Sequence, residues 1–329
     1  PYSENAAALH AMIAAWQLVP SSRGRIGDPS LWPVDIAPFV SKDTARARWQ
    51  CFDASEALTP DLFQGNTLRC AGTTPVGAPA GSGSANRPGD ASGSALSAAR
   101  DAAATTSGDG NLIDPSRPCD VGEHAEGVRV CRSHGTTAFV VGDADGNVVA
   151  VTQTLGTWGG NFYVTPGLGF LYNDKLTSYG SDPDSYGARL PYARHGSTIA
   201  PTIVTRGDGA ERRPVLAVGA AGNAWITSAV YQTLVGVLDD GLSAQEALEL
   251  PRFLPGTRGS GAERAFEISI ESGVNPDVLR TLERMGYHFD VISLPGELRM
   301  GYGAAITFGD GSVTAGADPR RSGAAAAVP

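Results

Sequence analysis

The stretch "TTAFVVGDADGNVVAVTQTLG", residues 136–156, decides the fold. It contains two runs of apolar and β-branched residues, 136–142 and 147–154, and the turn-forming residues "DADG" (143–146) separate them. This pattern is typical of a β-hairpin. We therefore expect two antiparallel strands over residues 136–154, the first of which begins at Thr136.

The sequence on either side of the hairpin predicts a mixed α/β fold. Apolar and β-branched runs predict further strands at 200–205, 214–219, 266–270, 288–293 and 303–308. Helical spacing of apolar residues predicts helices at 3–18, 224–238, 243–250 and 275–287. Suitable N-cap residues stand at Ser3, Ser243 and Asn275, and Pro276 occupies the first helical position of the last helix.

The composition is that of a soluble globular protein. Of the 329 residues, 42% are hydrophobic and 18% are charged, which is enough for one large core or two ordinary ones. The formal net charge of −9 and the lack of a run rich in Lys and Arg argue against nucleic acid as a partner. No apolar segment reaches the length of about 18 residues that a membrane span requires.

The ends and the middle of the chain suggest processing from something longer. The sequence starts at Pro1 without a charged-then-apolar signal pattern, so we expect part of a longer protein whose compartment stays open. The composition, rich in Ala, Gly and Arg, is compatible with a bacterial source of high GC content. Residues 71–135 are dominated by Gly, Ala, Ser and Pro, which predicts a flexible linker.

The four cysteines leave disulfides and buried thiols equally open: Cys51, Cys70, Cys119 and Cys131. The five histidines have no ligand spacing, so neither a metal nor another cofactor is expected.

Gly135 and Thr136, at the start of the hairpin, suggest nucleophilic chemistry. A threonine hydroxyl is a weak nucleophile, but an N-terminal threonine can use its own α-amine as the base. Gly135 has no Cβ and suits a strained peptide bond that the Thr136 hydroxyl attacks, giving an ester that water opens. Most Gly-Thr-Thr triplets are ordinary strand entries, so the triplet alone does not decide between the two interpretations.

Motifs along the rest of the chain favour the chemical interpretation. After the hairpin come "GLGFLYND" (167–174), "GSTIAPTIV" (196–204), "LAVGAAGNAWI" (216–226), "ALELPRF" (247–253) and "GADPRRSG" (316–323). In this order and spacing they resemble the small subunit of γ-glutamyltransferases, which are N-terminal nucleophile (Ntn) hydrolases. The earlier "GDPSLWPVDIAPFVSKDTARAR" (27–48) resembles the end of that family's large subunit.

The resemblance implies an organisation of the whole molecule. The fold would be a four-layer αββα sandwich, with two sheets face to face. Residues 1–70 would form the C-terminal part of the large subunit, 71–135 a linker ending at the self-cleavage site, and 136–329 the small, catalytic subunit. The two subunits would form a heterodimer, with a higher oligomer left open, and the N-terminal portion of the large subunit is not in this chain.

The resemblance also assigns catalytic roles. Thr136 matches the nucleophile freed by cleavage after Gly135, and Thr154 matches the threonine whose hydroxyl positions it. The oxyanion hole matches Gly222 and Asn223, which precede a predicted helix. Backbone N–H groups at a helix N-terminus stabilise a developing negative charge, so the residues themselves agree with this role. Asn223 replaces a second glycine and would narrow or re-aim the hole; an ordinary strand-to-helix turn remains the alternative for Gly222.

The substrate-binding positions depart further from the family. Ser197 and Thr198 match two serines that hold a glutamate α-carboxylate, so hydroxyl donors are retained. The family binds the α-ammonium with an Asn, a Gln and an Asp, and the matching residues here are Gly156, Lys175 and Ser178. The anionic anchor is thus lost, and Lys175 would repel an ammonium and attract an anion. A neighbouring Asp174 would neutralise it, and a solvated loop lysine remains the alternative.

The expected function is a self-processing hydrolase or acyltransferase with altered acyl specificity, whose small-molecule substrate carries a carboxylate. The resemblance extends to amidases acting on oxamate or glutaryl side chains. It also extends to relatives in lincomycin and pyrrolobenzodiazepine biosynthesis that cleave a carbon–carbon bond to an α-keto acid fragment. An ordinary γ-glutamyl hydrolase or transpeptidase is the alternative within the family. The alternative of another class is an unprocessed relative used for binding or assembly, against which the intact Thr136 and Thr154 argue.

Overall fold

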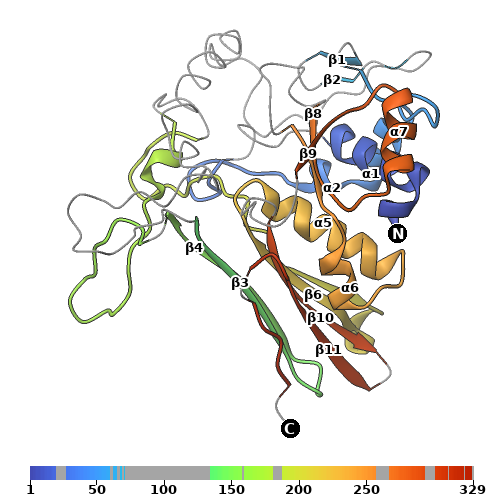
Figure 1. Ribbon diagram of the computed structural model, residues 1–329. Coiled ribbons are helices and arrows are strands. Elements are labelled where there is room, and N and C mark those ends of the chain that lie inside the picture. The colour runs from blue at the N-terminus through green and yellow to red at the C-terminus, as the bar shows by residue number, and fades with distance from the viewer. Residues whose placement is uncertain are drawn as a thin grey trace, which may run out of the picture.

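The computed structural model contains a four-stranded sheet, a long hairpin beside it and a smaller three-stranded sheet (Figure 1). It describes residues 1–19, 27–59, 62–64, 67–68, 70, 134–157, 159–180, 187–256, 267–292, 301–309, 311–321 and 323–327. The expected linker, 71–135, lies almost wholly outside these residues, so its flexibility and the proposed domain division stay predictions. No helix in the described ranges is both long and apolar enough to cross a bilayer.

The four-stranded sheet is antiparallel and has the order β11-β10-β6-β5. Its strands are β5 (Thr202–Arg206), β6 (Arg213–Ala221), β10 (Tyr302–Gly309) and β11 (Ser312–Ala317), with a 3-10 turn η5 (Gly209–Glu211) between β5 and β6. The apolar run "PVLAVGAA" in β6 explains its central place, because such a run has no face suited to solvent. The predictions for β5, β6 and β10 are confirmed, whereas β11 was not predicted.

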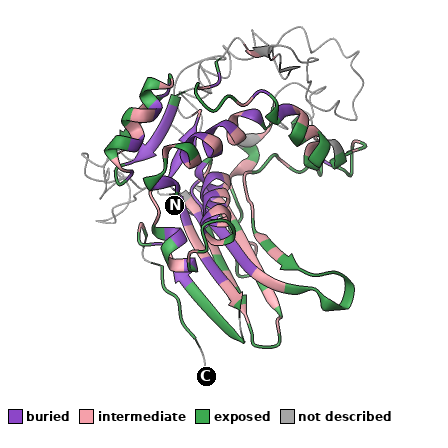
Figure 2. Cartoon of the chain, turned by 90° about the vertical axis from the view of Figure 1, so that its right-hand side faces the viewer, coloured by how far each residue is buried: buried purple, intermediate pink, exposed green. Residues whose placement is uncertain are grey.

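Two helices cover one face of this sheet. α5 (Trp225–Leu238) packs on β6 and β10, and α6 (Ala244–Glu249) packs on β10 and β11. Ser243 caps α6 as predicted and forms a capping box with Glu246. Figure 2 shows that the helix lying on the sheet is largely buried, while the far ends of the strands are exposed.

The hairpin packs on the opposite face of the sheet. It consists of β3 (His134–Gly142), which starts two residues before the expected Thr136, and β4 (Val148–Thr157). Gly219 of β6 permits the close approach, since a Cβ there would lie 3.3 Å from the Ala138 Cβ and from the Thr152 Oγ1. The other hairpin face leaves large apolar side chains exposed: Phe139, Val141 and Val149.

The described elements thus form three of the four expected layers: helices, sheet and hairpin. Along the ranges that the structure describes, no helix covers the outer face of the hairpin. The mixed α/β class is confirmed, and the complete four-layer sandwich stays a prediction.

The smaller sheet forms a separate core with two helices. Its strands are β7 (Phe253–Pro255), β8 (Glu267–Glu271) and β9 (His288–Ile292); β8 and β9 are parallel and connected through α7 (Pro276–Arg284). The first helix of the chain, α1 (Ala6–Leu18), packs against α7 and β7. Six apolar side chains of this core have 0% exposure: Leu9, Ile13, Phe253, Ile268, Ile270 and Leu282. β8, β9 and α7, with Asn275 as its N-cap, are confirmed, whereas β7 was not predicted.

The expected helix at 3–18 starts later than predicted. Tyr2–Glu4 form a short 3-10 turn, η1, and α1 begins at Ala6 with Asn5 as its N-cap. The Asn5 side chain accepts the Ala8 N–H at 3.1 Å, which satisfies a helix-end donor. The prediction of Ser3 as the N-cap was therefore wrong. Ser3 is instead buried in η1, and its carbonyl accepts a hydrogen bond from the Asn275 amide.

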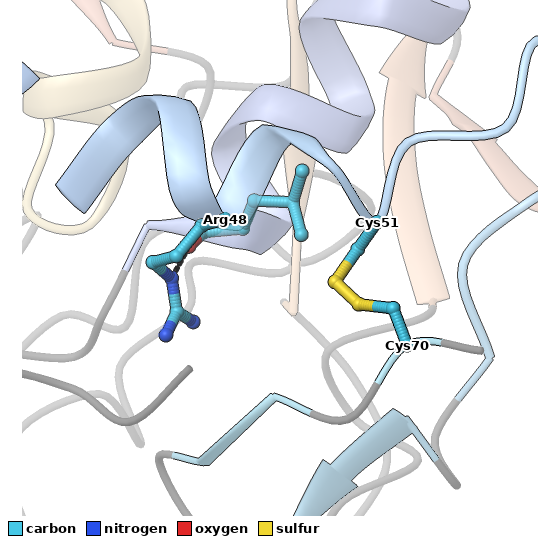
Figure 3. Close-up of a disulfide and its surroundings, with 4 residues drawn as sticks. Arg48, Cys51 and Cys70 are labelled. Atoms are coloured by element: carbon cyan, nitrogen blue, oxygen red, sulfur yellow. Dashed lines mark hydrogen bonds between the residues drawn. A yellow bond between two sulfur atoms is a disulfide. The ribbon is translucent and has the colours of Figure 1, made fainter. Parts of the chain in front are cut away.

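The N-terminal segment contains further short elements and a disulfide. It adds α2 (Ala37–Val40), α3 (Lys42–Trp49) and the two-stranded pair β1 (Phe63–Gln64) and β2 (Thr67–Leu68). A Cys51–Cys70 disulfide joins the end of α3 to the residues after β2, and the Arg48 side chain donates to the Leu18 carbonyl nearby (Figure 3). Of the two alternatives left open by the sequence, a disulfide or buried thiols, the disulfide therefore holds for Cys51 and Cys70. Cys119 and Cys131 lie outside the described residues.

Candidate active site

Two threonine hydroxyls meet at the open end of the hairpin. The register pairs Thr136 of β3 with Thr154 of β4, and their Oγ1 atoms are 2.8 Å apart. The Gly156 amide donates to the Thr154 Oγ1 at 2.9 Å, which leaves the Thr154 hydrogen available for Thr136. Only 4% of Thr136 is exposed, so its hydroxyl is fixed in a largely desolvated place. The structure therefore brings together the predicted nucleophile and its predicted partner.

A bulge in β4 shapes the site beside this pair. Between the pairs His134↔Thr157 and Thr136↔Thr154, β4 contains one residue more than β3. Gly156 lies in the bulge with a φ of 95°, a conformation that favours glycine. A Cβ on Gly156 would lie only 1.8 Å from the Asp174 Oδ1 and 3.3 Å from the Lys175 Cε. The missing side chain at position 156 is thus what admits the Asp174 carboxylate.

The segment after the bulge carries the remaining residues of this group. Lys175 and Ser178 lie in η4 (Lys175–Ser178), and the Lys175 amide donates to the Asn173 Oδ1 at 3.0 Å. Lys175 is half-buried, and among the described carboxylates none comes within 4 Å of its ammonium. The side chain of Ser178 lies outside the described part.

A second group forms where β6 turns into α5. Gly222 and Asn223 both have positive φ values, 123° and 53°. Asparagine is one of the few residues other than glycine that adopts this conformation readily, so Asn223 retains the turn. A Cβ on Gly222 would lie 2.6 Å from the Gly301 Cα, which fixes the turn against the start of β10. The Thr198 hydroxyl donates to the Asn223 carbonyl at 2.8 Å, whereas Ser197 is exposed and its hydroxyl accepts the Ile199 amide at 3.2 Å.

Arg321 connects the two groups, and the sequence did not assign it a role. Its guanidinium donates to the Thr136 carbonyl at 3.1 Å. It also lies over the Tyr302 ring, 5.1 Å from the ring centre. Tyr302 pairs with Ala221, the residue before Gly222. A path of direct contacts thus runs from Thr136 to the Gly222 turn, and its only sequence signal was the Arg pair in "GADPRRSG".

A buried ion network anchors the segment that carries Arg321. Arg252 donates to the Asp318 Oδ2 at 2.5 Å and to the Gly301 carbonyl at 2.6 Å. Arg320 donates to Glu271 at 2.5 Å and to the Asp318 Oδ1 at 3.1 Å. Burial alone would raise the pKa of the Asp318 carboxyl, but the two guanidiniums lower it below its ordinary value. These ion pairs fix the chain three residues before Arg321.

The described part of the chain thus stacks a helix-covered sheet on a hairpin whose first strand presents a buried threonine. The chain belongs to the gamma-glutamyltranspeptidase family, whose family model matches residues 101–328. This confirms the resemblance seen in the motifs.

Individual relatives agree with this membership. The chain is 32% identical over 193 residues to the glutathione hydrolase proenzyme of Bacillus subtilis (strain 168), covering 59% of this chain and 31% of that protein. It is 30% identical over 196 residues to the acylase ACY 1 proenzyme of Pseudomonas sp. (strain V22), covering 60% and 32%. The chain thus spans about a third of the length of the curated relatives it matches.

A solved structure shares the fold. The cephalosporin acylase from Bacillus halodurans matches with a TM-score of 0.59 at 19% identity, covering 96% of this chain and 44% of that one. At this identity the likeness concerns the fold alone. It extends over the N-terminal segment and the small sheet as well as the hairpin, because nearly the whole chain is covered.

Proposed function

We propose that this chain carries the catalytic part of a self-processing amide hydrolase or acyltransferase with Thr136 as its nucleophile. The observation that carries the proposal is the buried hydroxyl pair, Thr136 Oγ1 and Thr154 Oγ1, 2.8 Å apart. Membership of the gamma-glutamyltranspeptidase family supports it, as do relatives named proenzymes. The bulge opposite Gly135 supports cleavage at this point, because it interrupts the regular strand pairing at the bond to be cut.

In the processing step, the Thr136 Oγ1 attacks the Gly135 carbonyl carbon. The Gly135–Thr136 amide bond breaks, an ester forms, and the nitrogen takes up the hydroxyl proton to become the α-amine of Thr136. Water then hydrolyses the ester, which leaves a carboxylate on Gly135 and restores the Thr136 hydroxyl. Thr154 would orient the attacking oxygen, since its own oxygen already accepts the Gly156 amide.

In the catalytic cycle, the free α-amine accepts the proton of the Thr136 hydroxyl as this attacks a substrate carbonyl. The Gly222 and Asn223 amides are proposed to stabilise the oxyanion that forms, in the positive-φ turn before α5. The leaving amine departs with a proton, and the acyl group stays on Thr136 as an ester. Water or an acceptor amine then releases it.

We further propose that the acyl group carries a carboxylate and lacks the ammonium of an ordinary γ-glutamyl group. Thr198 lies beside the Gly222 turn, and Lys175 lies over the bulge at Gly156 without a carboxylate partner among the described residues. Amides of dicarboxylic acids fit this arrangement. A cation at Lys175 would also suit the α-keto acid fragment of a carbon–carbon cleavage.

One observation favours the ordinary γ-glutamyl activity as a second candidate. The Asp174 Oδ1 occupies the space over Gly156, so a carboxylate lies next to the bulge that follows Thr154. It would replace the lost anionic partner of a substrate ammonium. The two candidates therefore differ in whether Asp174 binds the substrate or only neutralises Lys175.

Processing is tested by intact mass and N-terminal sequencing of the full-length protein. The wild type is expected to split, with the smaller piece starting at Thr136, whereas Thr136→Ala stays whole. Thr137→Ala is the matched control, because Thr137 is the next residue but is exposed on the other face of the hairpin. A wild type that stays whole would leave Thr136 without a free amine and favour the binding or assembly alternative.

Specificity is tested with glutaryl and γ-glutamyl p-nitroanilides, which differ only in the ammonium. The proposal predicts faster hydrolysis of the glutaryl compound and a roughly tenfold or greater loss of this activity in Lys175→Met, while Asp174→Asn changes it little. Preference for the γ-glutamyl compound, lost in Asp174→Asn, would establish the second candidate. Carbon–carbon cleavage needs a separate substrate, an α-keto acid derivative, and release of its α-keto acid fragment without hydrolysis of either anilide would indicate that reaction.

A further inference from the structure

Arg321 holds Thr136 by an atom that processing leaves in place. The carbonyl oxygen that accepts the Arg321 N–H at 3.1 Å lies on the C-terminal side of Thr136. Cleavage breaks the bond on the N-terminal side, so this contact is compatible with both the uncut and the processed chain. In the processed chain it would fix the residue that has just become a chain end.

The same contact places a positive charge near the future α-amine. The nitrogen and the carbonyl oxygen of one residue lie about 3 to 4 Å apart. The guanidinium nitrogen that bonds the oxygen is therefore at most about 7 Å from the amine, and a like charge at this distance disfavours protonation. A neutral amine is the form that can accept the hydroxyl proton.

We propose that Arg321 is a positioning residue that keeps the freed α-amine of Thr136 neutral near pH 7 by lowering its pKa. The inference rests on the proposed function, because only cleavage creates this amine. The proposed role of Arg321 is thus separate from those of Thr136, Thr154 and Gly222. Arg321 would act through its charge as well as through a hydrogen bond.

The surroundings of Arg321 favour this role. Its guanidinium lies over the Tyr302 ring, and the buried ion pairs of Asp318 and Arg320 fix the preceding residues. Burial raises the pKa of the Tyr302 phenol, so this neighbour stays neutral. Arg321 itself is exposed, and solvent will therefore weaken its effect.

The other charged side chains around the site form ion pairs or lie against the bulge at Gly156. Asp318 and Arg320 form an ion pair with each other, and Asp318 also pairs with Arg252. Asp174, just before η4, and Lys175, its first residue, lie over the bulge at Gly156 and carry opposite charges. Within the described ranges, Arg321 is the charged side chain that hydrogen-bonds Thr136.

The test is an NMR titration of the processed protein labelled with ¹³C at the threonine Cα. The Thr136 resonance is identified by its absence from a Thr136→Ser sample, and its shift with pH reports the α-amine. Arg321→Met, which removes the charge but retains a stem, is expected to raise the titration midpoint by about 0.5 to 1 pH unit. Arg321→Lys is expected to retain most of the lowered midpoint, and the exposed control Arg212→Met to leave it unchanged.

Salt provides a second measurement on the unaltered protein. Raising NaCl from about 0.02 M to about 1 M shortens the screening length roughly sevenfold, so the wild-type midpoint should rise towards that of Arg321→Met. Equal midpoints in wild type and Arg321→Met, or a midpoint that does not respond to salt, would overturn the inference even if processing occurs. A wild type that never frees Thr136 would remove both this inference and the proposed function, and intact mass distinguishes that case.

Should Arg321→Met fail to process, the salt series on the wild type decides the question alone. A merely structural role for Arg321 would lower the yield of processed protein in Arg321→Met and Arg321→Lys alike. It would not raise the midpoint with salt, because the chain carries a net charge of −9 and screening of net negative charge lowers the pKa of an amine.

Discussion

The small-sheet core and the hairpin are stabilised in different ways. The small-sheet core, α1 and α7 with β7–β9, is closed by apolar side chains such as Leu9, Ile268 and Leu282, each 0% exposed. The hairpin meets β6 through small and hydroxyl-bearing residues, and Thr136 depends on directed contacts from Thr154 and Arg321. Apolar burial is non-directional and supplies stability, whereas hydrogen bonds fix the position of particular atoms. The comparison indicates that stability and the geometry of the site are encoded in different parts of the chain.

The buried ion network connects these two regions, so a substitution in it is expected to affect both stability and the geometry of the site. Glu271 belongs to β8 of the small sheet, while Asp318 follows β11 of the large one. Asp318→Ala would leave the Arg252 guanidinium buried with one partner fewer, and we expect a loss of about 3 to 5 kcal/mol in the free energy of unfolding. Processing at Gly135 should slow as well, because Arg321 loses its anchor. Urea denaturation and the time course of cleavage measure the two effects.

Leu282→Ala is the matched change in the apolar core. It should lower the free energy of unfolding by about 2 to 5 kcal/mol, because apolar burial is lost and a cavity is created. Processing should stay intact at temperatures where the protein is folded. Slow cleavage in both variants at equal stability would mean that the site depends on overall stability and not on the network. Rapid cleavage in Asp318→Ala would disconnect the network from Thr136.

The sequence predicted the regular elements of both regions better than it predicted the contacts between them. α5, α6 and α7 and most strands follow from apolar periodicity and caps, which are local signals. β7 was missed because it has only three residues, and β11 was missed because its run SVTAGA contains mostly small residues and a glycine, which give a weak strand signal. The Thr136–Thr154 pair follows from the hairpin and the family resemblance. Arg321, Gly301 and the approach of Asp174 to Gly156 join segments far apart in the chain, and no local pattern encodes such contacts.

Two threonines of β4 sharpen the distinction between stability and position. Thr152 and Thr154 lie on the same face of the strand. The Thr154 hydroxyl has two partners, whereas the buried Thr152 Oγ1 has no hydrogen-bond partner in the described part of the chain. Thr154→Val should abolish or strongly slow processing and cost about 1 kcal/mol of stability. Thr152→Val should leave processing unchanged and stabilise the protein by up to about 1 kcal/mol, since it removes an unsatisfied hydroxyl.

Intact mass over time and thermal denaturation read out this pair of variants. The same substitution two residues apart is thus expected to change stability in opposite directions. If both variants process at the wild-type rate, Thr154 does not position Thr136. If Thr152→Val destabilises the protein, its hydroxyl contributes in a way that the contacts do not explain.

The smallest expected effect concerns Asp28, which ties the N-terminal segment to the residues before Ser197. The buried Asp28 carboxylate accepts the Ser30 amide and hydroxyl and the Arg194 amide, and these bonds lower its pKa to about 2. Because the folded pKa lies below the ordinary value, its stabilisation is present above the unfolded pKa and is lost as pH falls through about 2. Wild type should therefore be more stable than Asp28→Asn at pH 6, and the difference should vanish towards pH 2 in urea titrations. A difference that stays constant over this range would show that the carboxylate charge contributes nothing, and that shape alone joins Asp28 to the 194–198 segment.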